Sequence, residues 1–140
     1  MADSPLIVKI CGITSVADGL AALAAGADWL GFVRWPKSKR FVEHEKAAEL
    51  VRELRAQATA PFAAIGVYVD ADRGTIEDDI AALGLDRIQL HGNESADFAR
   101  ALPLPALKAI RVRDRTLAAV LAADYPDIDL LADAFDPSLP

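Results

Sequence analysis

Several side chains that could do chemistry stand directly after apolar runs of the sequence. Cys11, the only cysteine, follows the run 6–8, and Asp133 follows the run 128–131. An ionised thiol is a candidate base or nucleophile, and an acid beside a buried strand is costly unless it is paired or functional. The other members of this set are the basic loop 34–40, Asp70, His91, Lys108 and Arg111. Because the carboxyl ends of parallel strands form one rim of an α/β fold, we expect these residues to converge there.

Each of these residues also has a purely structural interpretation. Free cysteine is among the most buried residue types, and the basic loop that contains Arg40 could be a solvated surface loop. Asp70 and Asp72 are residue types that cap helices, so we expect capping for at least one of them. His91, before a glycine, could complete the hydrogen bonds of a turn, and we expect His44, in the polar start of a helix, on the surface.

Apolar stretches alternate along the chain with stretches of helical periodicity. We expect strands at 6–10, 29–33, 62–69, 86–90, 107–112 and 128–131. Helices are expected between them, over 15–26, 43–56, 75–83, 95–102 and 114–123. The buried residues expected from helical spacing are Leu20, Leu23 and Ala24 in the first helix and Ala47, Leu50, Val51 and Leu54 in the second.

The strict alternation predicts an α/β fold of parallel strands joined by right-handed crossovers. A doubly wound open sheet and part of an eight-stranded barrel both fit. A complete barrel needs about 200 residues or more. We therefore expect this 140-residue chain, as a single domain over 1–140, to fall short of a barrel by two strand–helix units.

Composition restricts the partners of the chain. The net charge of −6 does not favour a nucleic acid, and no apolar run approaches the length that spans a membrane. A single cysteine fits a reducing, cytoplasmic compartment, and the first residues lack the pattern of a signal peptide. We expect neither a metal nor a nucleotide cofactor, because the sequence has no cluster with metal-ligand spacing and no glycine-rich phosphate motif.

Five motifs follow one another along the chain: KICGIT at 9–14, GFV at 31–33 with PKSKRF at 36–41, GVYVD at 66–70, QLHGNE at 89–94 and LLADA at 130–134. In this order and spacing they resemble the phosphoribosylanthranilate isomerase family of tryptophan biosynthesis. The resemblance implies units of a TIM-type (β/α)8 barrel. It covers the part of the family that carries the first six strands, roughly the first two-thirds.

The resemblance also implies a reaction, the Amadori rearrangement of N-(5-phosphoribosyl)anthranilate to an aminodeoxyribulose phosphate, without a cofactor. Cys11 matches the general base of the family and Asp133 its general acid. Arg40 matches the position that holds the anthranilate carboxylate, and His91 matches a position that lines the substrate pocket. Lys9 and Gln89 are likewise expected to bind substrate.

The sequence departs from the family at two places. Arg34 and Trp35 stand where the family usually has an aromatic pair, so Trp35 could stack on the anthranilate ring or simply pack in its loop. The strands with glycine-rich loops that bind the substrate phosphate in the family have no counterpart here. We therefore expect weak or no activity from the 140-residue chain alone, and self-association through open sheet edges.

Two other functions remain open at this level. A non-catalytic fragment could serve as an assembly module of the same fold. A receiver-like domain would use Asp70 as a phospho-acceptor with Lys108 nearby, but the sequence lacks an acidic pair after the first strand and a hydroxyl residue after the fourth.

Overall fold

The computed structural model describes residues 5–134, in which six strands alternate with five helices. The strands are β1 (Lys9–Cys11), β2 (Trp29–Val33), β3 (Ala63–Tyr68), β4 (Arg87–Leu90), β5 (Ala106–Val112) and β6 (Asp129–Ala134). The helices are α1 (Val16–Ala24), α2 (His44–Gln57), α3 (Arg73–Leu83), α4 (Ala96–Arg100) and α5 (Arg115–Ala123). All six expected strands and all five expected helices are therefore present.

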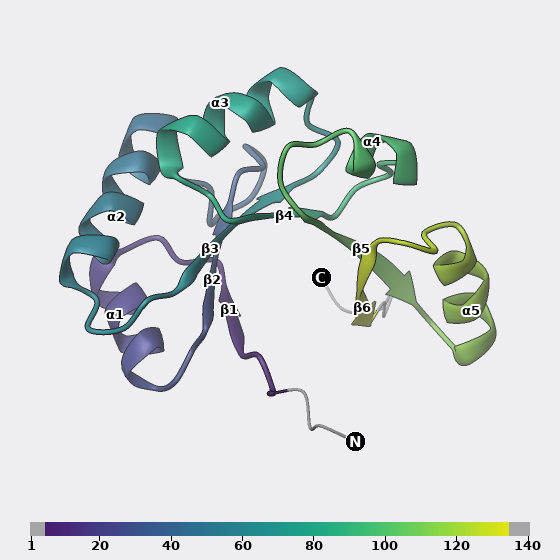
Figure 1. Cartoon of the computed structure of the whole chain (residues 1–140), viewed down its shortest axis with the longest axis horizontal. Coiled ribbons are helices and arrows are strands. Elements are labelled where there is room, and N and C mark those ends of the chain that lie inside the picture. The colour runs from purple at the N-terminus through teal and green to yellow at the C-terminus, as the bar shows by residue number, and fades with distance from the viewer. Residues whose placement is uncertain (1–4, 135–140) are drawn as a thin grey trace.

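The strands form one parallel sheet in the order β1-β2-β3-β4-β5-β6. The sheet curves into an open arc, and the helices lie on its outer side (Figure 1). A doubly wound sheet reverses its strand order at a switch point and carries helices on both faces. The sequential order with helices on one side is that of a (β/α)8 barrel, so the receiver-like alternative is wrong.

The first and the last strand differ most from the sequence prediction. β1 begins at Lys9 rather than at residue 6, and β6 extends to Ala134. Asp133 consequently lies inside β6, opposite Arg111 of β5, rather than after the strand. β6 is also largely exposed, so the expectation that Asp133 follows a buried strand is wrong.

Four helices begin with a side chain that caps the backbone. Ser15, Asp72, Ser95 and Asp114 each accept a hydrogen bond from the backbone N–H three residues later. These contacts satisfy donors that the first turn of a helix leaves free. Ser15, Ser95 and Asp114 stand at the expected starts of their helices, and of the two candidate aspartates it is Asp72 that caps α3.

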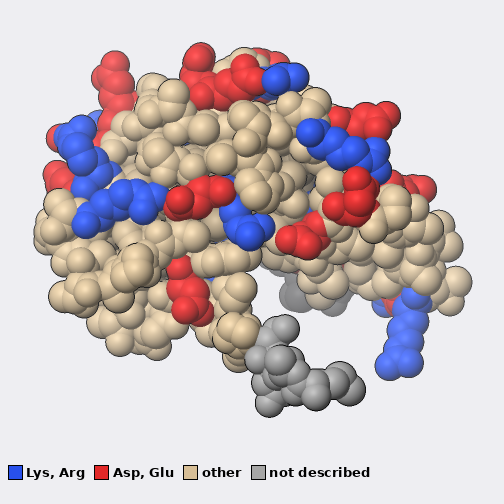
Figure 2. Space-filling model, viewed as in Figure 1, with Lys and Arg blue, Asp and Glu red and all other residues tan. Residues whose placement is uncertain are grey.

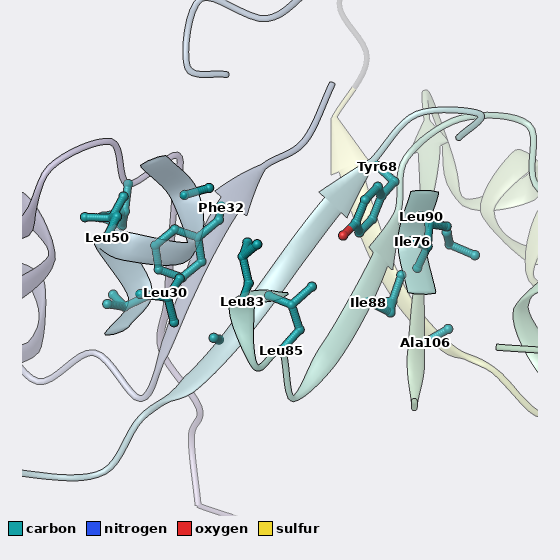
Figure 3. Packing of buried hydrophobic residues seen from close by; sticks show 14 of the residues in the cluster. Leu30, Phe32, Leu50, Tyr68, Ile76, Leu83, Leu85, Ile88, Leu90 and Ala106 are labelled. Carbon is teal, nitrogen blue, oxygen red and sulfur yellow. The ribbon is translucent and has the colours of Figure 1, made fainter. Parts of the chain in front are cut away.

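The hydrophobic core lies between the sheet and the helices (Figure 3). The four residues expected on the buried side of α2 are all buried, with Val51 and Leu54 fully covered. Gly19 of α1 gives Leu54 room, because a Cβ on this glycine would stand 2.5 Å from a Leu54 methyl. The prediction for α1 holds less well, since Leu20 and Leu23 are only half-buried and Ala24 is exposed.

The two ends of the sheet carry exposed apolar side chains. At the β1 end these are Leu6, Ile7, Val8 and Ile10. At the other end Leu130 of β6 and Val120 of α5 are exposed. The apolar residues of the interior strands are covered by the neighbouring strands and helices. Among the described residues, the edge strands β1 and β6 each pair with a strand on one side alone, and their apolar residues are exposed.

Charged side chains of both signs are intermixed on the face seen in Figure 2. None of the helices in the described part of the chain has the length and apolar composition of a membrane span.

Candidate active site at the carboxyl ends of the strands

The turn after β1 brings Arg40 against Cys11. Gly12 has a φ of +79°, in the left-handed region, and a Cβ there would stand 2.5 Å from the Arg40 side chain. Position 12 therefore favours glycine for two reasons: the backbone has a positive φ, and the Arg40 side chain occupies the space that a Cβ would need. Arg40 Nη1 donates to the Cys11 backbone carbonyl at 3.3 Å, so the guanidinium lies directly over this turn.

Cys11 and Lys9 share one face of the sheet above Gly31 of β2. A Cβ at Gly31 would stand 2.8 Å from the Cys11 Sγ and 3.1 Å from the Lys9 Nζ. The absence of a side chain at this position thus makes room for both groups. Cys11 is exposed rather than buried, so the interpretation as a core residue is wrong and its thiol can meet a ligand.

Asp133 and His91 form the second group of the site. His91 Nε2 lies 3.0 Å from Asp133 Oδ2, and the two side chains are 26% and 43% exposed. On the other side of the imidazole, His91 Nδ1 lies 3.1 Å from Gln89 Nε2. Gln89 is buried at the end of β4, whereas His91 begins the turn after it. Residues 42 positions apart in the chain therefore meet because β4 and β6 both pair with β5.

A buried ion pair holds the turn between β4 and α4. The side chains of Lys108 and Glu94 are each 4% exposed and lie 2.8 Å apart. Glu94 also accepts from the backbone N–H groups of Asp70 and Gly92, both at 2.9 Å. Asp70, with a φ of +50°, accepts in turn from the Asn93 N–H at 2.7 Å. These contacts fix the turn that His91 begins.

Lys108 and Asp70 were candidates for chemistry, and the structure places both in this supporting network. Lys108 donates to the Gly92 carbonyl as well as to Glu94, so it is a buried structural cation rather than a free group at the rim. Glu94 stands in the QLHGNE motif but was not among the residues expected at the rim. One feature of the sequence points to this role. Glu94 directly follows the turn after one strand, and Lys108 stands among apolar residues in the first part of the next strand, where it needs a buried partner.

A second buried network lies on the helix side of the sheet, away from the candidate site. Asp79 of α3 accepts from Arg34 Nε at 2.8 Å and from the Tyr68 hydroxyl at 3.0 Å, and it contacts His44 Nδ1 at 2.7 Å. Arg34 is buried, so its assignment to a solvated basic loop is wrong. His44 is exposed, so its expected place on the surface is confirmed, and its ring also contacts the buried Asp79 carboxylate.

Burial is the main reason that the pKa of Tyr68 is raised far above its ordinary value, and the negative charge of Asp79 adds to the effect. Trp35, next to Arg34, is partly exposed in its loop.

A cavity of about 360 Å³ opens beside His91. Its polar lining comes from the turns after β3 and β4, from β5 and from α5: Asp70, His91, Asn93, Lys108, Arg111 and Tyr125. The same rim holds Cys11, Arg40 and Asp133, since each lies at or after the carboxyl end of its parallel strand. Among residues 5–134, no group of three His, Cys, Asp or Glu side chains is placed to hold a metal ion.

A sequentially ordered parallel sheet with outer helices, and with acid–base groups at its carboxyl edge, defines a (β/α)8-barrel protein. The family model described as N-(5'phosphoribosyl)anthranilate (PRA) isomerase matches residues 8–135. The chain belongs to the phosphoribosylanthranilate isomerase family.

Relatives in two bacteria show how much of the family the chain spans. The N-(5'-phosphoribosyl)anthranilate isomerase of Nitrosomonas europaea is 44% identical over 135 residues, which are 95% of this chain and 62% of the relative. That of Citrifermentans bemidjiense is 42% identical over 132 residues, covering 94% of this chain and 61% of the relative. The chain thus spans about 62% of the length of the first of these proteins.

Solved structures agree with the fold. Phosphoribosylanthranilate isomerase from Thermotoga maritima superposes with a TM-score of 0.86 at 32% identity, over 96% of this chain and 64% of that one. The Thermus thermophilus enzyme gives 0.78 at 34% identity, over 94% and 64%. A structure of the isomerase in complex with reduced 1-(o-carboxyphenylamino)-1-deoxyribulose 5-phosphate gives 0.84 at 32% identity, over 94% and 66%.

Proposed function

We propose that this chain carries the acid and the base of phosphoribosylanthranilate isomerisation. The observation that supports the proposal is the placement of the motif residues at one rim. Cys11 is exposed beside Lys9 and Arg40, and Asp133 is half-exposed beside His91. In the proposed reaction, Asp133 protonates the ring oxygen of the ribose as the C–O bond breaks. Cys11 thiolate then removes the C2 proton that the resulting iminium makes acidic.

Substrate recognition is proposed for the residues that surround these two groups. Arg40 would hold the anthranilate carboxylate, because a guanidinium offers two parallel donors to a carboxylate. Lys9 stands next to the thiol, where an ammonium would attract an anionic substrate. His91, in the turn after β4, would line the pocket together with Gln89. The proposed reaction uses no cofactor. As a base, Cys11 must remain a free thiol, and a reducing, cytoplasmic compartment keeps thiols in this state.

A turnover assay tests the assignment of Asp133 as the general acid. The purified chain is given N-(5-phosphoribosyl)anthranilate, and the reaction is followed through the fluorescence of the anthranilate group. We expect weak turnover that Asp133→Asn lowers by about 100-fold or more, the usual range for losing a general acid. Asp129→Asn is the matched control, since Asp129 stands on the same strand at its opposite end and is exposed. Equal turnover by the Asp133 variant and its control would refute the assignment.

Binding of the reduced product analogue tests the same site without turnover. Calorimetry measures the affinity for this analogue. We expect Arg40→Met to lower the affinity at least tenfold, whereas the control Lys39→Met, in the same loop, should leave it unchanged. An absence of both turnover and Arg40-dependent binding would favour the alternative of a non-catalytic module of this fold.

We also propose that the chain self-associates through the two ends of its sheet. Leu6 is 86% exposed, Ile7 50% and Ile10 42% at the β1 end, and Val120 is 60% exposed at the other. Apolar side chains beside unpaired strand edges favour association with another chain. Light scattering across a concentration series should show a dimer or larger species, and a monomer at all concentrations would contradict the proposal.

A further inference from the structure

Gln89, His91 and Asp133 form a linear chain of hydrogen-bonding groups from the sheet interior to the rim. Gln89 is 3% exposed, and its Nε2 lies 3.1 Å from His91 Nδ1. His91 Nε2 lies 3.0 Å from Asp133 Oδ2. The remaining polar atom, Gln89 Oε1, is buried and meets no hydrogen-bond partner among the described residues. One of the three groups is therefore only half-satisfied.

The orientation of the Gln89 amide dictates where protons lie on His91. With Nε2 toward the ring, the amide donates to Nδ1, which must then carry no hydrogen. The neutral ring consequently bears its hydrogen on Nε2 and donates it to Asp133, which is a carboxylate in this arrangement. An unpaired buried carbonyl oxygen is also tolerated better than an unpaired amide nitrogen, which favours this orientation.

The reversed amide creates the opposite arrangement. Oε1 then faces Nδ1 and accepts a hydrogen from it. The bare Nε2 of a neutral ring accepts from a protonated Asp133, or a doubly protonated ring donates to the carboxylate. Either form contains one proton more than the first arrangement, and that proton enters from solvent through the half-exposed Asp133 carboxyl. The reversed amide therefore favours the form in which the pair of His91 and Asp133 holds the extra proton, because it accepts the hydrogen on Nδ1 that the first orientation opposes.

We propose that the Gln89 amide controls the loading of this proton, so that Gln89 is a positioning residue for the general acid. The proposal rests on the proposed function in one respect, the role of Asp133 as the acid. The charged groups that face His91 from other elements are Asp133 of β6, Arg111 and Lys108 of β5 and Asp70 after β3. Lys108 is already paired with Glu94, and the contact of Nδ1 is with the Gln89 amide, at 3.1 Å.

Nitrogen NMR of the histidines in the intact chain tests the proposal directly. His44 is the second of the two histidines and serves as an internal reference, because its partner is Asp79 on the helix side of the sheet. In the unaltered chain at alkaline pH we expect His91 to carry its hydrogen on Nε2. Gln89→Glu offers only acceptors to Nδ1, so His91 should hold a hydrogen on Nδ1 and stay doubly protonated to a pH at least one unit higher.

Gln89→Met is the second variant, since it has a similar shape and neither donates nor accepts. Asp133 still accepts from Nε2 in this variant, so the neutral ring should keep its hydrogen on Nε2. His91 should nevertheless become doubly protonated at a higher pH than in the unaltered chain, because no amide hydrogen then opposes a hydrogen on Nδ1, while the His44 signals stay unchanged. An unchanged titration midpoint of His91 in either folded variant would overturn the proposal, as would an Nδ1–H tautomer in the unaltered chain.

This measurement needs no substrate, so its result is independent of turnover. The expected tautomers with no effect of Asp133→Asn on catalysis would refute the proposed function alone. Loss of catalysis in Asp133→Asn with unaltered His91 titration midpoints in the Gln89 variants would refute the role of Gln89 alone.

Discussion

The buried ion pair of Lys108 and Glu94 offers a quantitative test of how the β4 turn is held. Replacement of Lys108 by Met removes the cation and leaves a carboxylate that is 4% exposed. Breaking a buried pair in this way costs about 3–5 kcal/mol. Glu94 keeps two backbone N–H donors, from Asp70 and Gly92, so we expect the lower end of this range, about 3 kcal/mol.

Urea unfolding followed by tryptophan fluorescence measures the loss. The double variant Lys108→Met with Glu94→Gln removes both charges. Its loss of unfolding free energy should be about 2 kcal/mol smaller than the sum of the losses in the two single variants. Arg73→Met is the control, because Arg73 and Glu77 form an exposed pair at 2.6 Å that is worth at most about 1 kcal/mol. If Lys108→Met and Arg73→Met cost the same, the argument that burial makes the first pair indispensable is refuted.

Two further predictions concern backbone geometry and alkaline stability. Gly12→Ala should cost about 1–2 kcal/mol more than Gly84→Ala in urea unfolding, because both glycines have positive φ but only Gly12 lies against the Arg40 side chain; equal losses would show that this contact is unimportant. The raised pKa of Tyr68 means that unfolded chains release its proton first, above about pH 10. The free energy of unfolding should therefore fall as the pH rises above about 10, and Tyr68→Phe should flatten this fall; an unchanged slope would refute the assignment to Tyr68.

The order of elements and most of the core were predictable from the sequence. Alternating apolar and helical stretches predicted every strand and helix, and the spacing of Ala47, Leu50, Val51 and Leu54 predicted the buried side of α2. The expected helix starts at Ser15, Ser95 and Asp114 coincide with side chains that cap the backbone. These features depend on periodicity and on neighbours a few residues away, which a sequence displays directly.

The residues at the rim were also predictable, because each stands at a strand end, and parallel strands place these ends at one edge. Their partners were not. Nothing local to Arg34 or Lys108 reveals that each meets a buried carboxylate, Asp79 in one case and Glu94 in the other. Such pairs form across elements that are distant in the chain, so they depend on how helices pack on the curved sheet.

The sequence alone therefore determined the family, the succession of strands and helices and the set of candidate groups. Tertiary structure decided which of these groups are exposed and which are paired. Cys11 has room for its thiol because Gly31 carries no side chain, whereas Asp133 meets His91 only because β4 and β6 flank the same strand. The physical reason is that burial and hydrogen bonding depend on distances in space, and sheet pairing sets those distances between residues far apart in the chain.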